Sequence, residues 1–147
     1  MSNAIFTSTP GYGDTLLEML HYRQAVRVGD RVEISGQGGW GRDLSFPVSF
    51  PEALDEEIVQ AFENVERTLA TVGASWTDVI AVDSYHVPTA ADTIGDDHTS
   101  VMVEQFRKRM GDRAPIWTQL GVAALGAPGM RVEIRVTALV GQSDEDR

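Results

Sequence analysis

The chain has 147 residues, of which 42% are hydrophobic, so we expect one domain with a single core. Its 22 acidic side chains outnumber 12 Lys and Arg side chains, and the net charge of −10 argues against nucleic acid or an anionic membrane as partner. There is no cysteine, no export signal and no apolar window long enough for a membrane span, which predicts a soluble cytoplasmic protein without disulfides.

The first clear hydrophobic period begins after residue 20. Residues 1–20 lack such a period, so we expect an N-terminal arm laid over the domain with at most a short turn of helix. Residues 22–28 and 31–37 then predict two strands, because Gly29-Asp30 supplies the positive φ of a two-residue hairpin turn. Closely spaced glycines follow, where the backbone can bend or approach a ligand: Gly36, Gly38, Gly39 and Gly41.

A long amphipathic helix is predicted next. Ser49 and Glu52 match a capping box, Pro51 suits the first turn, and Gly73 ends the pattern. Apolar side chains at spacings of three or four form one stripe: Leu54, Ile58, Phe62, Val65, Leu69 and Val72. The opposite face is acidic and is expected to be solvated: Glu56, Glu57, Glu63 and Glu66.

A strand and a shorter helix follow. Residues 78–87 are rich in Val and Ile and stop at Pro88, which predicts a strand. Residues 99–110 predict a helix that ends before Gly111, with Met102, Phe106 and Met110 on one face. The preceding Asp96-Asp97-His98 is an alternative cation site, but carboxylates before a helix are typical caps. The three histidines have no metal-ligand spacing, so no metal is predicted.

The C-terminal part predicts two more strands. Residues 115–124 and 130–140 are joined by a turn at residues 126–129, and we expect these strands to pair. Apolar and polar residues alternate in the second run, so its polar face carries a carboxylate between two guanidinium groups: Arg131, Glu133 and Arg135. Residues 141–147 are polar and are expected to form a flexible tail.

The element order ββαβαββ predicts an α+β fold in a single domain, residues 1–147. It consists of one mixed sheet with both helices on one face. The other face would then have to accommodate Trp40, Trp76 and Trp117 together with several Val and Ile residues. Because obligate interfaces resemble a divided core, a second subunit is the simplest cover, and an oligomer is expected.

Several short motifs occur together, in order and with matching gaps, from about residue 22 to residue 140. They are Tyr22-Arg23-Gln24-Ala25-Val26, Gly29-Asp30, Ser35-Gly36-Gln37, Ala61-Phe62-Glu63-Asn64-Val65 before Leu69, Pro115 with Thr118, and Val132-Glu133-Ile134. As a set they resemble the RidA/YjgF family of reactive-intermediate imine deaminases. The resemblance implies a chorismate-mutase-like fold and a homotrimer whose sheets form an inner barrel. It also implies three clefts between subunits for a small-molecule substrate.

The resemblance also implies a reaction and a set of site residues. The family hydrolyses enamines and imines released by pyridoxal-phosphate enzymes, such as 2-aminoacrylate, to a keto acid and ammonia, without metal or cofactor. Glu133 matches the residue that orients or activates the attacking water, and Tyr22 matches a ring that lines the cleft. Ser35 and Gly36 match a segment whose backbone faces the substrate. A carboxylate suits this reaction because a proton must pass between water and nitrogen.

One motif departs from the family. Its Pro-Ala-Arg-Thr type arginine binds the substrate carboxylate, but here the motif reads Pro115-Ile116-Trp117-Thr118. Loss of a charge-assisted pair costs about 1.5 to 3 kcal/mol. We therefore expect a less anionic, flatter or more apolar ligand than 2-aminoacrylate, with Trp117 and Thr118 at the site. Arg131 and Arg135 share the strand face of Glu133 by alternation, so either is an alternative anion clamp.

Other interpretations remain open. The group around Glu133 also fits an interfacial ion-pair ladder, and Trp117 fits subunit packing as well as ligand binding. A trimer that binds a small metabolite or a protein partner without catalysis is the alternative to an imine hydrolase. Ribonuclease action has been attached to the family by name, but the acidic charge and the lack of a basic patch in the sequence argue against it.

Overall fold

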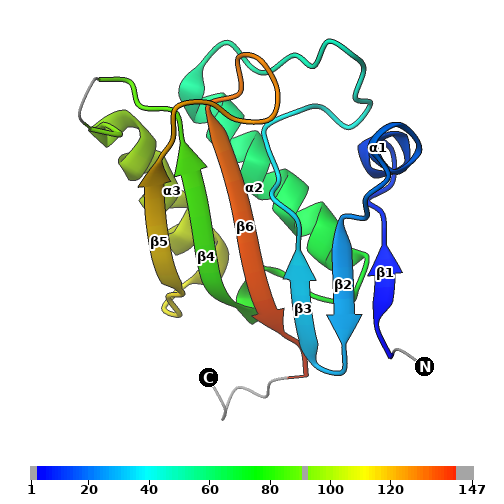
Figure 1. The fold of residues 1–147 in the computed structure, drawn as a ribbon. Coiled ribbons are helices and arrows are strands. Elements are labelled where there is room, and N and C mark those ends of the chain that lie inside the picture. Colours follow the sequence, from blue (N-terminus) through cyan, green and yellow to red (C-terminus); the bar gives the residue numbers. More distant parts are fainter. Residues whose placement is uncertain (1–2, 91–92, 142–147) are drawn as a thin grey trace.

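The computed structural model describes residues 3–90 and 93–141 and is built on one six-stranded mixed sheet (Figure 1). Helices α2 and α3 cover one face of the sheet, and we call the opposite face the open face. The elements are β1 (Ile5–Thr7), α1 (Tyr12–Leu20), β2 (Ala25–Val28), β3 (Arg31–Ile34), α2 (Leu54–Ala70), a 3-10 turn (Trp76–Asp78), β4 (Val79–His86), α3 (Asp96–Met110), β5 (Ile116–Gly121) and β6 (Val132–Leu139). The predicted α+β fold is confirmed, and most of the tail predicted at 141–147 lies outside the described residues.

The strand order across the sheet is β1-β2-β3-β6-β4-β5. The predicted hairpin of β2 and β3 is confirmed, with Gly29 at φ 60° in its turn. The predicted pairing of the last two strands is wrong, because β5 pairs in parallel with β4 and β6 pairs with β3 and β4. Alternation of apolar residues shows that a segment is a strand but does not identify its neighbour. The α3 crossover between β4 and β5 allows their parallel pairing.

Residues expected to form an arm contain two regular elements. Strand β1 pairs with β2 and forms one edge of the sheet, and α1 is a helix of nine residues rather than a short turn. Tyr12 and Leu16, one helical turn apart, are buried and anchor α1. The Tyr12 hydroxyl also donates a 2.6 Å hydrogen bond to the buried Gln37 side chain. With Trp40 and Met130, Tyr12 and Leu16 form a second apolar cluster, apart from the main core. The sequence analysis missed it because a single turn of apolar spacing is a weak signal.

Helix α2 packs its predicted stripe against the sheet. Ile58, Phe62, Val65 and Leu69 are fully buried. The helix begins at Leu54, after Ala53, so the predicted capping box at Ser49 is wrong. One residue on the supposedly solvated face is also an exception. Glu57 is 0% exposed and accepts hydrogen bonds from the Arg131 side chain at 2.6 Å and from the Arg131 backbone N–H at 2.8 Å.

All three tryptophans pack within the chain. Trp76 stacks on Phe62 with ring centroids 4.8 Å apart, and Trp40 contacts Tyr12 edge-on at 5.6 Å. The ring centroid of Trp117 lies 5.1 Å from that of Phe106 in α3. A second subunit, which the sequence analysis expected as their cover, is therefore not needed for these rings, and the oligomer itself stays a prediction.

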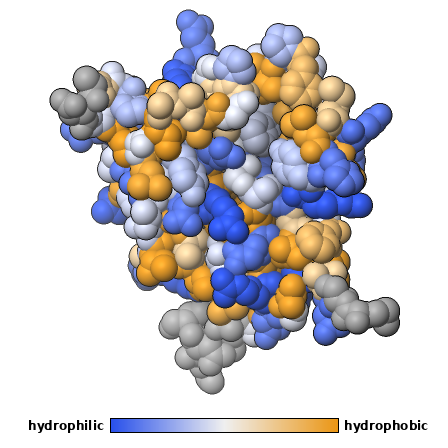
Figure 2. Space-filling model, viewed as in Figure 1, coloured by the Kyte–Doolittle hydropathy of each residue, from blue (hydrophilic) through white to orange (hydrophobic). Residues whose placement is uncertain are grey.

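Other apolar side chains remain exposed toward the two edges of the sheet. Phe6 and Val28 lie on β1 and β2 at one edge, and Ile116 and Leu120 lie on β5 at the other. Figure 2 views the open face and shows hydrophobic groups toward both sides, with hydrophilic groups between them. No helix in the described part of the chain combines the length and apolar character needed to cross a membrane.

Candidate functional site

Glu133 projects from β6 onto the open face. Its neighbours Val132 and Ile134 are fully buried on the helix side, and side chains alternate along a strand. The segment after β3 is held beside β6 by two backbone hydrogen bonds between Gln37 and Ile134, of 2.8 and 2.9 Å. This pairing places Gly36 directly against the Glu133 carboxylate. A Cβ on residue 36 would lie 2.6 Å from Glu133 Cδ, so only glycine fits beside this carboxylate as it stands.

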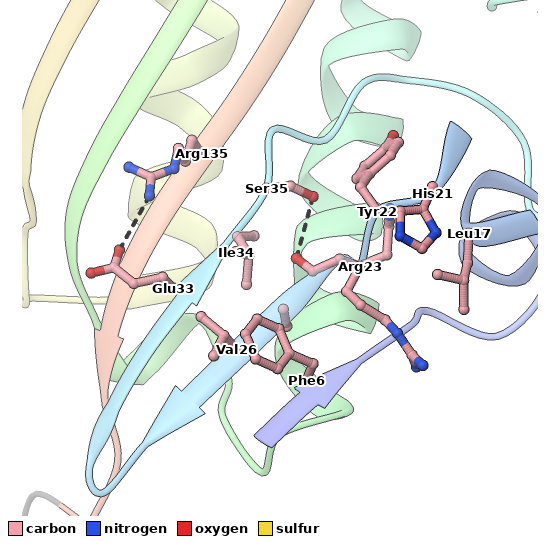
Figure 3. Close-up of a pocket in the computed structure, with 12 residues that line it drawn as sticks. Phe6, Leu17, His21, Tyr22, Arg23, Val26, Glu33, Ile34, Ser35 and Arg135 are labelled. Carbon is pink, nitrogen blue, oxygen red and sulfur yellow. Dashed lines mark hydrogen bonds and ion pairs between the residues drawn. The ribbon is translucent and has the colours of Figure 1, made fainter. Parts of the chain in front are cut away.

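Tyr22 lies close to Glu133, and Ser35 directly precedes Gly36. Burial raises the pKa of Tyr22, a hydrogen bond with Gln24 lowers it, and the nearby Glu133 charge raises it further. The Ser35 hydroxyl donates to the Gln24 carbonyl at 3.3 Å. Both residues line a surface pocket of about 660 Å³, to which β6 contributes Arg135 (Figure 3). The structure thus brings the predicted residues Tyr22, Ser35, Gly36 and Glu133 together.

The Glu133 carboxyl has a pKa above its usual value of 4.5 because burial disfavours its charged form. The sequence left the direction of this shift open, since two arginines flank the residue. Within residues 3–90 and 93–141, Glu133 forms no ion pair. A carboxyl group with a raised pKa exchanges protons more readily near neutral pH than an ordinary surface glutamate.

Both flanking arginines pair with other carboxylates. The guanidinium of Arg131 contacts Glu57 at 2.6 Å and the Pro51 carbonyl at 2.9 Å. Because Arg131 precedes the first residue of β6, the alternation of side chains along the strand does not place it beside Glu133. Arg135 does lie on the open face, where its guanidinium is 3.8 Å from Glu33. The ion-pair ladder considered for Glu133 therefore exists around Glu33, which Arg31 also contacts at 2.7 Å.

Trp117 lies on the helix side of the sheet. Its indole N–H donates to Ser84 Oγ at 2.9 Å, and its ring packs against Phe106. Thr118 projects from the other side of β5 and is exposed. Trp117 and Glu133 therefore project from opposite faces of the sheet, and a single chain does not place them in one cleft. The position of Trp117 in the motif did not reveal which face it occupies, because that face depends on the register of β5 with β4.

A buried histidine pair adjoins Trp117 and was missed by the sequence analysis. His86 Nε2 lies 2.9 Å from Ser84 Oγ, and His86 Nδ1 lies 3.0 Å from His98 Nδ1. Burial, and secondarily His98, lowers the pKa of His86 to about 4. Side chains alternate along β4, so Ser84 and His86 lie on the same side of the sheet. This spacing is the sequence feature that could have indicated the pairing of Ser84 with His86. No group of three or more potential metal ligands occurs among the described residues.

The histidine pair predicts acid destabilisation. Below pH 6.5 an unfolded histidine takes up a proton, whereas folded His86 stays neutral until about pH 4. Protons therefore favour the unfolded chain, and the free energy of unfolding should fall by about 3 kcal/mol between these limits. Urea unfolding across this pH range measures the loss. The exposed His21 is the matched control, and His21→Asn should leave the pH dependence intact. A flat profile for both proteins would contradict the prediction.

Three comparisons relate the chain to known proteins. A family model described as Endoribonuclease L-PSP matches residues 14–140. The RutC family protein YjgH of Escherichia coli (strain K12) is 33% identical over 119 residues, which is 81% of this chain and 82% of that protein. The solved structure of Rv2704 from Mycobacterium tuberculosis, a YjgF/YER057c/UK114 family member, is 26% identical with a TM-score of 0.71, covering 93% of this chain and 99% of that one. RidA from an Antarctic Psychrobacter is 27% identical with a TM-score of 0.68, covering 83% and 90%.

Proposed function

Because this chain belongs to the Endoribonuclease L-PSP family, which includes the YjgF and RidA proteins, we propose that it hydrolyses an enamine or imine to a carbonyl compound and ammonia. The observation that carries the proposal is a half-buried carboxyl group, Glu133, without an ion-pair partner among the described residues and beside Tyr22 and Gly36. The family description names ribonuclease activity, but the net charge of −10 opposes binding of a phosphate backbone.

The proposed reaction needs only water and one proton carrier. Glu133 accepts a proton as water adds its oxygen to the imine carbon, and returns it to the nitrogen, which gives a carbinolamine. Glu133 then carries the hydroxyl proton of the carbinolamine to the same nitrogen, and ammonia leaves as the C–N bond breaks and the carbonyl forms. An enamine first takes a proton on carbon and becomes the imine. Because the pKa of Tyr22 is raised, its hydroxyl stays protonated and donates a hydrogen bond to the substrate or to the attacking water.

We further propose a cyclic homotrimer. The exposed apolar side chains at the two edges of the sheet, such as Phe6 and Ile116, form different patches. A contact between different patches closes into a ring of three when each subunit is rotated by a third of a turn from the last. In such a ring, β5 of one chain adjoins the β1 end of the next. Light scattering should then report three times the mass of one chain, and a single-chain mass would contradict the trimer.

Substrate choice should reflect the absence of an arginine at position 117. The indole of Trp117 brings no positive charge, and its N–H is already bonded to Ser84. A substrate carboxylate therefore has no charged partner at that position. Arg135 is an alternative on the Glu133 face, but its guanidinium also contacts Glu33.

Two imines with the same benzyl group test this substrate choice. One carries a carboxylate and is made from phenylalanine by an amino-acid oxidase; the other lacks it and is made from phenethylamine by an amine oxidase. We expect the kcat/KM values of the two imines to lie within about tenfold of each other. An arginine at position 117 would favour the imine with the carboxylate by about one to two decades, and this protein lacks that arginine. Semicarbazone trapping measures both reactions. A strong preference for the carboxylate would contradict the expectation and make Arg135 the candidate clamp.

A further inference from the structure

A second cavity of about 140 Å³ lies beside Glu133. Its walls come from α1, from the segment between β3 and α2, and from the turn before β6. Leu16, Trp40 and Met130 are buried and line its inner part, whereas Leu20 and Phe46 are 58% and 48% exposed and form its rim. The cavity therefore runs inward from the surface into the second apolar cluster of the chain.

Among the lining residues, Tyr22 brings a hydroxyl group and Glu133 a carboxyl group. No Lys, Arg or His side chain is among its described lining residues. A charged substituent would lose its hydration there without gaining a partner, which is costly. An apolar substituent would instead gain from leaving water, in proportion to the area it buries.

The volume sets an upper limit on the group that fits. An apolar protein cavity of about 150 Å³ holds one benzene molecule. The cavity beside Glu133 is of this size, so it accepts a phenyl ring or a branched alkyl chain. Tyr22 also lines the larger surface pocket, so this ring lies between the two spaces.

Resting on the proposed function, we infer that this cavity binds the side group of the substrate, which is an imine or enamine bearing an aryl or branched alkyl group. A side group held there places the attached C=N bond next to Glu133 and Tyr22, which line the same cavity. The larger pocket then gives water access to the reacting carbon. The protein would then select its substrate by the side group. The residues that make this selection line the cavity, and Trp117 is not one of them.

The test compares two imines that differ in the side group. Both are made by one amino-acid oxidase, a methyl imine from alanine and a benzyl imine from phenylalanine, and each rate is divided by its rate in buffer. The native protein should favour the benzyl imine by at least about tenfold in kcat/KM. Ala127→Phe fills the cavity and should remove this preference. Ala124→Phe lies on the same connection without lining the cavity and should retain it.

The outcomes separate this inference from the proposed function. Hydrolysis that depends on Glu133 but shows no side-group preference would overturn the inference and leave the function standing. If neither imine is hydrolysed, the function fails, and the cavity is tested by saturation-transfer NMR with benzyl alcohol. Binding to the native protein and to Ala124→Phe, but not to Ala127→Phe, supports the cavity as an apolar-group site. No binding to the native protein overturns it.

Discussion

Replacing Glu133 with glutamine is expected to lower the rate of imine hydrolysis by about 10²- to 10⁴-fold, the usual contribution of a positioned general acid or base. Glutamine keeps the size of the side chain and its position over Gly36, so the fold should be unaffected. It does not accept a proton from water or return one to nitrogen. The loss should appear in kcat for every imine tested, because proton transfer does not depend on the side group.

The measurement is semicarbazone formation from oxidase-generated imines, with Glu63→Gln as matched control. Glu63 is an exposed glutamate on α2, so its replacement should leave the rate unchanged. The native protein should also lose activity as the pH falls, because the base must be ionised. The midpoint should lie above 4.5, since burial raises the pKa of Glu133. Equal rates for the native protein, Glu133→Gln and buffer would leave a non-catalytic binding protein.

Gly36→Ala should lower activity by about 10²-fold, the order expected when a catalytic group is displaced by about 1 Å. The added methyl overlaps the Glu133 carboxylate, which must turn away. The φ angle of Gly36 is not positive, so alanine causes no backbone strain at this position. The carboxylate is the end of a flexible side chain on the open face, so the melting temperature should change little.

Gly41→Ala is the matched control for this prediction. It adds the same methyl in the same glycine-rich segment, where no neighbouring atom lies within 4 Å of the added carbon. Activity and thermal melting are measured for both variants. If both variants retain full activity, the close contact between residue 36 and Glu133 is not needed for the reaction. If both lose activity and stability together, the segment acts through folding.

Local periodicity predicted the elements that depend on nearby residues. The stripe from Ile58 to Leu69 and the turn at Gly29 were predicted because each is set within a few residues. The pair of Glu57 and Arg131 was not predictable, because it joins a helix to the start of a strand. A buried glutamate on an acidic helix face has no local signature.

The candidate site shows the same division. The ordered motifs pointed to Tyr22, Ser35, Gly36 and Glu133, and the pairing of the segment after β3 with β6 places Gly36 against Glu133. The sequence analysis did not show which side of the sheet Trp117 faces, because this follows from the pairing of β4 and β5. The apolar cavity was missed because its walls come from three separate segments.

Strand β6 follows the other five strands of the sheet in the chain, yet it lies in the middle of the sheet. Until β6 leaves the ribosome, β3 and β4 each lack one of their two neighbouring strands. The stretch that pairs beside Gly36 is then also missing. Glu133, the proposed proton carrier, arrives with the strand that joins the two halves of the sheet. The six-stranded sheet and the proposed site therefore form only after β6 has been made.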